Sequence, residues 1–284
     1  MIQVNGLTFA YAGTSKPAVR GLDFEVAQGE IFGFLGPSGA GKSTAQKVLN
    51  GLLQGYEGQV SVMGKELNQW GSDYYERIGV SFELPNHYLK LTAVENLTYY
   101  RALYKGSCQE PKALLEMVGL ENDGDLFVSQ YSKGMKNRLS VARALLHNPE
   151  LIFMDEPTAG LDPMNARRIK HIIQELKGNG RTIFLTTHDM NVANELCDRV
   201  AFIVEGEIKL IDSPRALRLR HSEPKVRVEY QDNGRLQQQD FSLDGIGHHQ
   251  PFLDLLQQDG IETIHTQEAT LEDIFIEVTG RGLS

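Results

Sequence analysis

The sequence lacks several features that define whole classes of proteins. It has only two cysteines in 284 residues, Cys108 and Cys197, and they do not form a Cys-x-x-Cys pair. A disulfide framework is therefore not expected, and a reducing cytosol is the natural environment. No apolar run approaches the roughly 20 residues that a membrane-spanning helix needs. The mixed first residues do not resemble a signal peptide, so any membrane role is expected to depend on a partner.

Positive charge is also scarce. Lys and Arg number 28 against 37 Asp and Glu, which gives a formal net charge of −9. This balance argues against a broad nucleic-acid surface, and no nucleic acid is predicted as a partner. Hydrophobic residues make up 41% of the chain, enough for a real core. The length suits one large domain and a small second one.

Apolar runs predict strands that alternate with helices in the first part of the chain. Buried strands are predicted at 31–35, 78–82, 151–154 and 182–185. Helices are predicted at 43–53 and 165–176, and residues 92–147 are mostly helical in pattern. This alternation predicts a parallel sheet with right-handed crossovers.

The sequence becomes more polar near residue 222, where segments such as 231–240 replace the apolar strands. We place a boundary at 215–224. Residues 1–215 then form the main domain, and residues 216–284 form a small accessory domain. In the latter, strands are predicted at 225–230 and 261–266, and helices at 252–258 and after the capping-box sequence that begins at Thr270.

A glycine-rich loop follows the strand at 31–35. Its sequence, Gly-Pro-Ser-Gly-Ala-Gly-Lys-Ser, fits the GxxxxGK[ST] phosphate-binding loop, and both flanks are correct, which disfavours a chance turn. Its backbone N–H groups and the start of the next helix would face phosphate oxygens. Lys42 would reach the β- and γ-phosphates, and Ser43 would bind Mg²⁺. The predicted ATP-binding residues here are Gly36, Pro37, Ser38, Gly39, Ala40, Gly41, Lys42, Ser43 and Thr44.

Two carboxylates follow the strand at 151–154. Asp155 and Glu156 would emerge at the carboxyl end of a parallel sheet, beside the phosphate loop. Asp155 can hold Mg²⁺ through its water shell, and Glu156 can polarise an attacking water. Alone, the pair is also compatible with a solvated acidic turn. Together with Lys42, it favours hydrolysis of a nucleoside triphosphate.

With these residues identified, the chain resembles the ABC ATPase family over roughly residues 1–215. Residues 131–135 (Tyr-Ser-Lys-Gly-Met) occupy the signature position, and residues 159–162 (Ala-Gly-Leu-Asp) look like the D-loop. His188 looks like the switch histidine, and Tyr11 lies where the family places an aromatic residue that stacks on adenine. The ordered set is far more specific than any single motif.

The resemblance implies an α/β fold of the P-loop NTPase type. Its ABC-type ATPase core has a mixed sheet and a helical subdomain at about 92–147, and a small C-terminal α+β domain follows. The resemblance also implies a homodimer in which each ATP lies between the phosphate loop of one copy and the signature of the other. His188 would bond the γ-phosphate and help to hold water in line with Glu156. The residues expected to contact ATP bound by the other copy are Ser132, Lys133, Gly134 and Asp162.

The signature departs from the family's usual LSGGQ. Tyr131, Lys133 and Met135 replace Leu, the first Gly and Gln, whereas Ser132 and Gly134 are kept. Lys133 either adds a positive charge near ATP or faces solvent.

The Q-loop departs as well, because Glu83 stands where the family has glutamine. Its carboxylate can still reach Mg²⁺ or water, although it could also face solvent. The apolar residues Tyr88, Leu89 and Leu91 lie in the region that receives a short helix of the membrane subunit in the family. They are compatible with a partner contact or with local core.

Other features are weaker. Histidines without metal-ligand spacing are expected at the surface, and no zinc is predicted; they are His147, His171, His248, His249 and His265. A basic cluster is either a docking surface or the solvated face of a helix, and it consists of Arg215, Arg218, Arg220 and His221.

The Q-loop, the signature and residues 271–276 resemble ATPases of ABC-2-type exporters, which are often tied to drug or antibiotic efflux. We predict an ATPase, using ATP and Mg²⁺, that energises export of a drug-like or other small molecule through a separately encoded membrane permease. It would be cytoplasmic and peripheral on the inner face of the plasma membrane. The alternative is a soluble ABC ATPase that remodels a macromolecular complex. The single ATPase half, with no long coiled coil between Lys42 and Asp155, disfavours that alternative.

Overall fold

The computed structural model describes residues 1–84, 86–222, 225–232, 234–258, 260–280 and 282. The chain divides into a larger unit built on Met1–Ser213 and a smaller unit built on Pro214–Arg281, and each is described by itself.

The secondary structure alternates between strands and helices along most of the chain. The strands are β1 (Ile2–Phe9), β2 (Val19–Val26), β3 (Ile31–Leu35), β4 (Glu57–Val62), β5 (Lys65–Glu66), β6 (Ile78–Ser81), β7 (Leu151–Asp155), β8 (Thr182–Thr187), β9 (Arg199–Val204), β10 (Glu207–Asp212), β11 (Lys225–Asp232), β12 (Arg235–Ser242) and β13 (Ile261–Gln267). The α-helices are α1 (Lys42–Leu49), α2 (Ala93–Arg101), α3 (Pro111–Met117), α4 (Lys133–Ala144), α5 (Pro163–Gly178), α6 (Met190–Leu196), α7 (Pro214–His221), α8 (Gln250–Leu256) and α9 (Leu271–Thr279). Short 3₁₀ helices are η1 (Leu67–Gln69), η2 (Ser72–Glu76), η3 (Val128–Gln130) and η4 (Ile246–His248).

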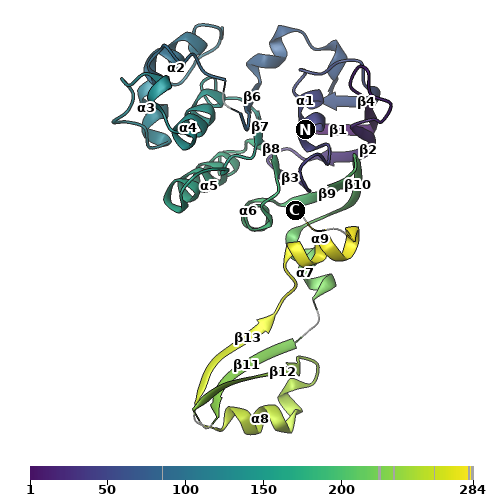
Figure 1. Ribbon diagram of the computed structural model, residues 1–284. Helices are drawn as coiled ribbons and strands as arrows, with labels where there is room; N and C mark the ends of the chain where they lie inside the picture. Colours follow the sequence, from purple (N-terminus) through teal and green to yellow (C-terminus); the bar gives the residue numbers. More distant parts are fainter. Residues whose placement is uncertain (85, 223–224, 233, 259, 281, 283–284) are drawn as a thin grey trace. The chain divides into compact units, whose positions relative to one another are not determined.

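A six-stranded sheet in the order β10-β9-β3-β8-β7-β6 forms the centre of the larger unit (Figure 1). Neighbouring strands run parallel, except that β10 is antiparallel to β9. Every residue of β3, β7 and β8 is buried, as expected for central strands of a sheet that is covered on both faces. The sheet is therefore mixed, and the predicted fold class is confirmed.

A second sheet, in the order β2-β1-β4-β5, is antiparallel. Buried and exposed residues alternate along β2, so one face of this sheet points into the core. On that face the ring of Phe24 lies 5.7 Å from the ring of Phe32 and 5.0 Å from that of Phe34, both on β3. These aromatic contacts join the two sheets in one core.

The helices α2, α3 and α4 follow one another between β6 and β7, within the region predicted to be helical. Thr92 caps α2 with a complete capping box, and the Ser132 hydroxyl accepts a hydrogen bond from a backbone N–H of the first turn of α4. The far end of α4 lies very close to β6. A Cβ atom on Gly79 would lie 2.2 Å from the carbonyl oxygen of Ala144, so no side chain fits at that position.

The smaller unit contains the antiparallel sheet β12-β11-β13. Its core is small and includes Val226, Val228, Phe241 and Leu255, the last of which lies on α8. The helices α7 and α9 contact each other in the same unit.

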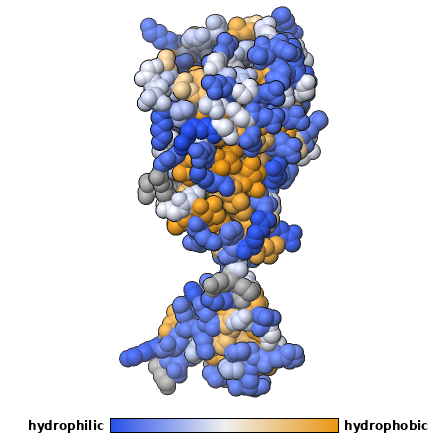
Figure 2. Space-filling view, turned by 90° about the vertical axis from the view of Figure 1, so that its right-hand side faces the viewer, coloured by the Kyte–Doolittle hydropathy of each residue, from blue (hydrophilic) through white to orange (hydrophobic). Residues whose placement is uncertain are grey.

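In the part of the chain that the structure describes, every helix is too short or too polar to span a bilayer. The face seen in Figure 2 is mostly hydrophilic, and one area of hydrophobic residues interrupts it.

The structure corrects three expectations. The helix predicted at 43–53 ends at Leu49, and Leu52 beyond it is 55% exposed. Gly51 follows the helix with φ of 79°, a left-handed conformation that stops the helix and favours glycine. The polar segment at 231–240 contains most of β12. His147 is buried rather than at the surface, and its Nε2 atom is hydrogen-bonded to the carbonyl oxygen of Ile78 at 2.8 Å.

Candidate active site

The phosphate loop connects β3 to α1, as the sequence predicts. Gly39 and Gly41 have φ of 79° and 106°, which favour glycine. A Cβ atom on Gly36 would lie 2.1 Å from the carbonyl oxygen of Ile203, and one on Gly41 would lie 2.6 Å from that of Ala18. The loop therefore has its glycines where the backbone conformation or a neighbouring backbone excludes a side chain.

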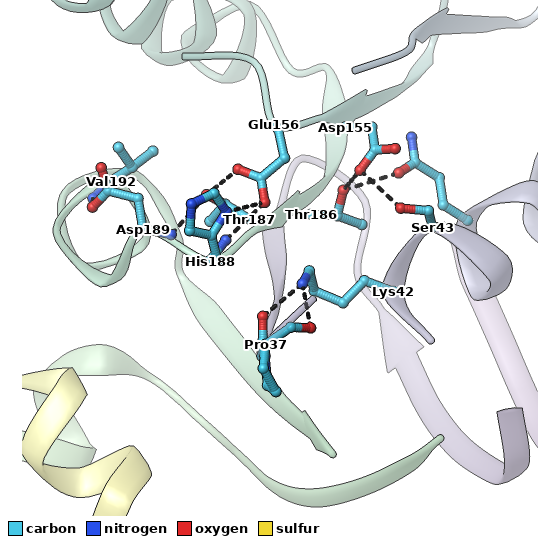
Figure 3. A network of polar contacts seen from close by, with 12 residues as sticks. Pro37, Lys42, Ser43, Asp155, Glu156, Thr186, Thr187, His188, Asp189 and Val192 are labelled. Atoms are coloured by element: carbon cyan, nitrogen blue, oxygen red, sulfur yellow. Dashed lines mark hydrogen bonds and ion pairs between the residues drawn. The ribbon is translucent and has the colours of Figure 1, made fainter. Parts of the chain in front are cut away.

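Lys42 points back across the loop (Figure 3). Its Nζ atom donates to the carbonyl oxygens of Gly36 at 2.6 Å and Pro37 at 3.0 Å. Burial lowers the pKa of Lys42, and the nearby carboxylates of Glu156, Asp155 and Glu83 act in the opposite direction by favouring the charged form. The buried ammonium of Lys42 therefore lies near three carboxylates, whose combined negative charge is larger than its own positive charge.

Asp155 ends β7 and faces the first turn of α1. Its Oδ1 atom accepts hydrogen bonds from the Ser43 hydroxyl at 3.3 Å and from the Thr186 hydroxyl on β8. Glu83 lines the same pocket. Hydroxyl and carboxylate oxygens are the ligands that Mg²⁺ prefers, so the chemistry of Ser43, Asp155 and Glu83 fits that ion.

Glu156 has φ of 48°, an unusual conformation for a residue with a side chain. Its carboxylate accepts hydrogen bonds from the Thr187 hydroxyl at 2.9 Å, the His188 backbone N–H at 2.9 Å and the His188 ring Nδ1 at 2.6 Å (Figure 3). Only 7% of Glu156 is exposed. Three donors therefore fix the orientation of one buried carboxylate, which is an arrangement suited to a base that acts on a positioned water.

These side chains meet in one cavity of about 480 Å³, which we call the nucleotide pocket. Its lining consists of Tyr11, Ala18, Ser38, Gly39, Ala40, Gly41, Lys42, Ser43, Thr44, Glu83, Asp155, Glu156 and His188. Tyr11 is 40% exposed, and its hydroxyl is hydrogen-bonded to that of Thr44 at 3.2 Å. Gly36 and Pro37, also predicted to bind ATP, do not line the pocket. Their carbonyl oxygens accept hydrogen bonds from Lys42, which does line it.

The residues predicted to act on the ATP of another copy do not line the nucleotide pocket. Ser132 caps α4 and is exposed, as is Lys133. A Cβ atom on Gly134 would lie 3.3 Å from the carbonyl oxygen of Gly160, so the signature and the D-loop are adjacent. Asp162 caps α5, and hydrogen bonds from Asn165 lower the pKa of its carboxyl group.

The structure also shows site residues that sequence reasoning missed. Thr187 bonds Glu156, which only the pairing of β7 with β8 reveals. The Asn137 amide on α4 donates to the carbonyl oxygens of Pro157 and Ala159, at 3.4 Å and 3.2 Å, and so joins the signature helix to the loop after Glu156.

Tyr131, a departure from the family pattern, has a structural explanation. It is 4% exposed, and its hydroxyl donates to the carbonyl oxygen of Asp123 at 2.8 Å. Burial raises the pKa of Tyr131 to about 12. The aromatic ring fills core space next to the signature, and the hydroxyl has a partner.

Two family models match the chain. Residues 19–159 match the model described as ABC transporter. Residues 225–268 match the model described as fluoroquinolone efflux ABC transporter C-terminal domain.

The chain is also similar to proteins named for transport. It is 57% identical, over all of its length and 95% of the relative, to a fluoroquinolones export ATP-binding protein of Mycobacterium tuberculosis. It is 34% identical to a bacitracin transport ATP-binding protein of Bacillus licheniformis, over 99% of this chain and 98% of the relative. The predicted resemblance to exporter ATPases is thus confirmed.

Among solved structures, the chain is similar to a dimeric ATP-binding cassette in a post-hydrolysis state bound to ADP and Pi. The TM-score is 0.70 and the identity 28%, over 75% of this chain and 98% of that one. Together with the nucleotide pocket, these similarities show that the chain belongs to the ABC transporter family, as an ATP-binding and ATP-hydrolysing subunit.

Proposed function

We propose that this subunit powers the export of a drug-like small molecule through a separately encoded membrane permease. The observation that carries the proposal is the convergence of Lys42, Ser43, Asp155, Glu156 and His188 in one pocket. These are the groups that binding and hydrolysis of a triphosphate require. The relatives named for fluoroquinolone export and bacitracin transport support a small-molecule cargo.

We assign the hydrolytic chemistry to a small set of residues. Lys42 and the loop N–H groups bind the phosphates, and Ser43, Asp155 and Glu83 hold Mg²⁺. When bound, Mg²⁺ supplies positive charge that offsets the charge of the phosphate oxygens. Glu156 accepts a proton from the attacking water, and His188 orients Glu156. Tyr11 supplies a partly exposed ring for the adenine.

The active form is a homodimer in this proposal. Ser132, Lys133, Gly134 and Asp162 of each copy complete the ATP site of the other copy. Their absence from the nucleotide pocket of their own chain supports this assignment, as does the dimeric state of a similar cassette. The exposure of Ser132 and Lys133 leaves both accessible to a second subunit.

The permease would dock on the surface around the loop after Glu83. A groove of about 270 Å³ lies there between β6 and α4, and Tyr75, Phe82 and Tyr100 are among its lining residues. Tyr88 and Leu89 nearby are 45% and 50% exposed. Exposed aromatic and apolar groups beside a groove suit a helix of a partner. The subunit would then work at the cytoplasmic face of the plasma membrane.

The two domains have different roles in this proposal. Residues 1–215 form the ATP-binding domain, with its helical subdomain at about 92–147. Residues 216–284 form an accessory domain, and none of its described residues is among those that line the nucleotide pocket.

The test is co-expression of the subunit with a candidate ABC-2-type permease, followed by purification in lipid. ATP hydrolysis and the uptake of norfloxacin into inside-out vesicles are then measured together. We expect norfloxacin transport that requires ATP and that is abolished by Glu156→Gln. Absence of a complex, or transport by the Glu156→Gln complex at the wild-type rate, would contradict the proposal.

A further inference from the structure

A second cavity, of about 390 Å³, lies in the smaller unit beside α7. We call it the α7 cavity. Small-molecule sites have volumes of about 300–1,000 Å³, so its size suits a ligand. It shares no residue with the nucleotide pocket, and the proposed function does not use it.

One wall of the α7 cavity is held in place by polar contacts. The Arg218 Nη1 atom donates to Glu268 at 2.8 Å, and the Ser222 hydroxyl oxygen accepts a hydrogen bond from the backbone N–H of Ala269 at 2.8 Å. These two contacts join α7 to the segment that follows β13. The cavity is therefore formed before any ligand binds.

The charges that line the α7 cavity are unbalanced. Arg215 and Arg218 contribute two guanidinium groups against the single carboxylate of Glu268, which Arg218 already engages. Among the described residues, Arg215 has no hydrogen-bond or ion-pair partner. The Nε atom of Arg218 is buried and has no acceptor, so that side chain contributes its positive charge to the cavity rather than an accessible donor. Unsatisfied guanidinium N–H groups bind carboxylates well, because both groups are planar and can form two parallel hydrogen bonds.

Apolar surface lies beside these cations. Leu219 and Leu243 line the α7 cavity and are 72% and 37% exposed. Two exposed leucines beside a basic site favour a ligand that covers them with an apolar body. Thr266 and Gln267 add polar side chains to the lining, and neither side chain is hydrogen-bonded to a described residue.

We propose that the α7 cavity binds an amphipathic organic carboxylate of drug size. The carboxylate would pair with the Arg215 guanidinium in the field of the neighbouring Arg218, and the apolar body would cover Leu219 and Leu243. The accessory domain then has a binding activity of its own. Only the choice of probe rests on the proposed export function, since an exported drug is a natural ligand for such a site.

The test uses the full chain without the permease and norfloxacin as the probe. Norfloxacin is an aromatic carboxylate, and binding is followed by its fluorescence anisotropy in EDTA, with excess ADP to fill the nucleotide pocket. We expect saturable binding that Arg215→Ala weakens about tenfold or more, as loss of a hydrogen bond to a charged group predicts. Leu219→Ser should weaken it as well, because the substitution removes apolar surface at an exposed position. Arg220→Ala, on the same helix but outside the lining, is the matched control.

The outcomes are distinct. Binding that is lost on decarboxylation of norfloxacin, weakened by Arg215→Ala and unchanged in Arg220→Ala supports the site. No saturable binding in the presence of excess ADP, or equal affinity in Arg215→Ala, overturns it. Transport by the complex with its permease is a separate measurement, so failure of the α7 cavity leaves the export test intact.

Discussion

The Glu156 carboxylate receives two hydrogen bonds from His188, one from the backbone N–H and one from the ring Nδ1 atom. Because an ionised carboxylate is an acceptor only, the ring nitrogen must carry the proton. The imidazole is thereby fixed in one orientation, with its other nitrogen directed away from Glu156. The side chain of His188 is 58% exposed, and its contact with the buried Glu156 carboxylate holds it in place.

Glu156→Gln should retain ATP binding and lose turnover. Glutamine has nearly the same shape but cannot accept the proton of water, and loss of general-base catalysis typically lowers kcat by about 10²–10⁴-fold. The same variant should accumulate as a dimer with Mg-ATP, measured by light scattering after gel filtration. Glu121→Gln, at an exposed position, serves as the control. A monomeric Glu156→Gln protein at saturating Mg-ATP would contradict the dimer.

His188→Ala should lower kcat less than Glu156→Gln does. The substitution removes the bond from Nδ1 and leaves the one from the backbone N–H. We expect a loss of about tenfold to a hundredfold, the effect of one hydrogen bond to a charged group. His188→Asn should recover part of the rate, because its amide can donate to Glu156. Equal kcat in wild type and His188→Ala, from steady-state ATPase assays, would remove His188 from this role.

Thr187→Val should reduce kcat with little change in KM for ATP. Its hydroxyl donates to Glu156 at 2.9 Å, and it does not line the nucleotide pocket. We expect a decrease of about tenfold. Thr187→Ser keeps the hydroxyl and should retain most of the activity. If both variants lost activity equally, packing rather than the hydrogen bond would explain the effect.

His87 should make the stability of the protein depend on pH. Burial lowers the pKa of its imidazole from 6.5 to about 4, and its Nε2 atom bonds the carbonyl oxygen of Lys136 at 2.9 Å. Because the folded pKa is below the unfolded one, the unfolded chain binds more protons between these values. The free energy of unfolding should therefore fall as the pH drops from about 6.5 to 4, by up to about 3 kcal/mol.

The measurement is urea unfolding of wild type and His87→Gln over this pH range. Glutamine can donate to the same carbonyl but does not titrate, so its stability should fall less steeply. His171→Gln, at an exposed histidine, should follow the wild-type slope. Parallel curves for wild type and His87→Gln would show that His87 does not contribute.

Site residues that lie within a short continuous motif can be predicted from the sequence alone. The phosphate loop and the pair Asp155 and Glu156 lie next to apolar strands, and the alternation of strands and helices predicts that both reach one edge of a sheet. The roles of Thr187 and Asn137 could not be predicted in this way. Their hydrogen-bond partners are 31 and at least 20 residues away in the sequence, and only the strand order and the helix packing bring them together. Their residue types carry no signal of this role.

The strand β12 was missed for a different reason. Its residues are exposed apart from Phe241, so the sequence of this strand does not alternate between apolar and polar residues. Backbone pairing with β11 along the whole strand, from Arg235 opposite Asp232 to Ser242 opposite Lys225, stabilises it instead. Amphipathic patterns reveal only strands that have an apolar face.

The contact at Gly79 has a mechanical consequence. With no room for even one methyl group between β6 and the carbonyl oxygen of Ala144, the backbones of the strand and of the end of α4 are in direct contact. Glu83 follows that strand, and Ser132 stands at the opposite end of that helix. A displacement of the loop after Glu83 would therefore be passed to α4 through this backbone contact and would reach the signature at the other end of the helix.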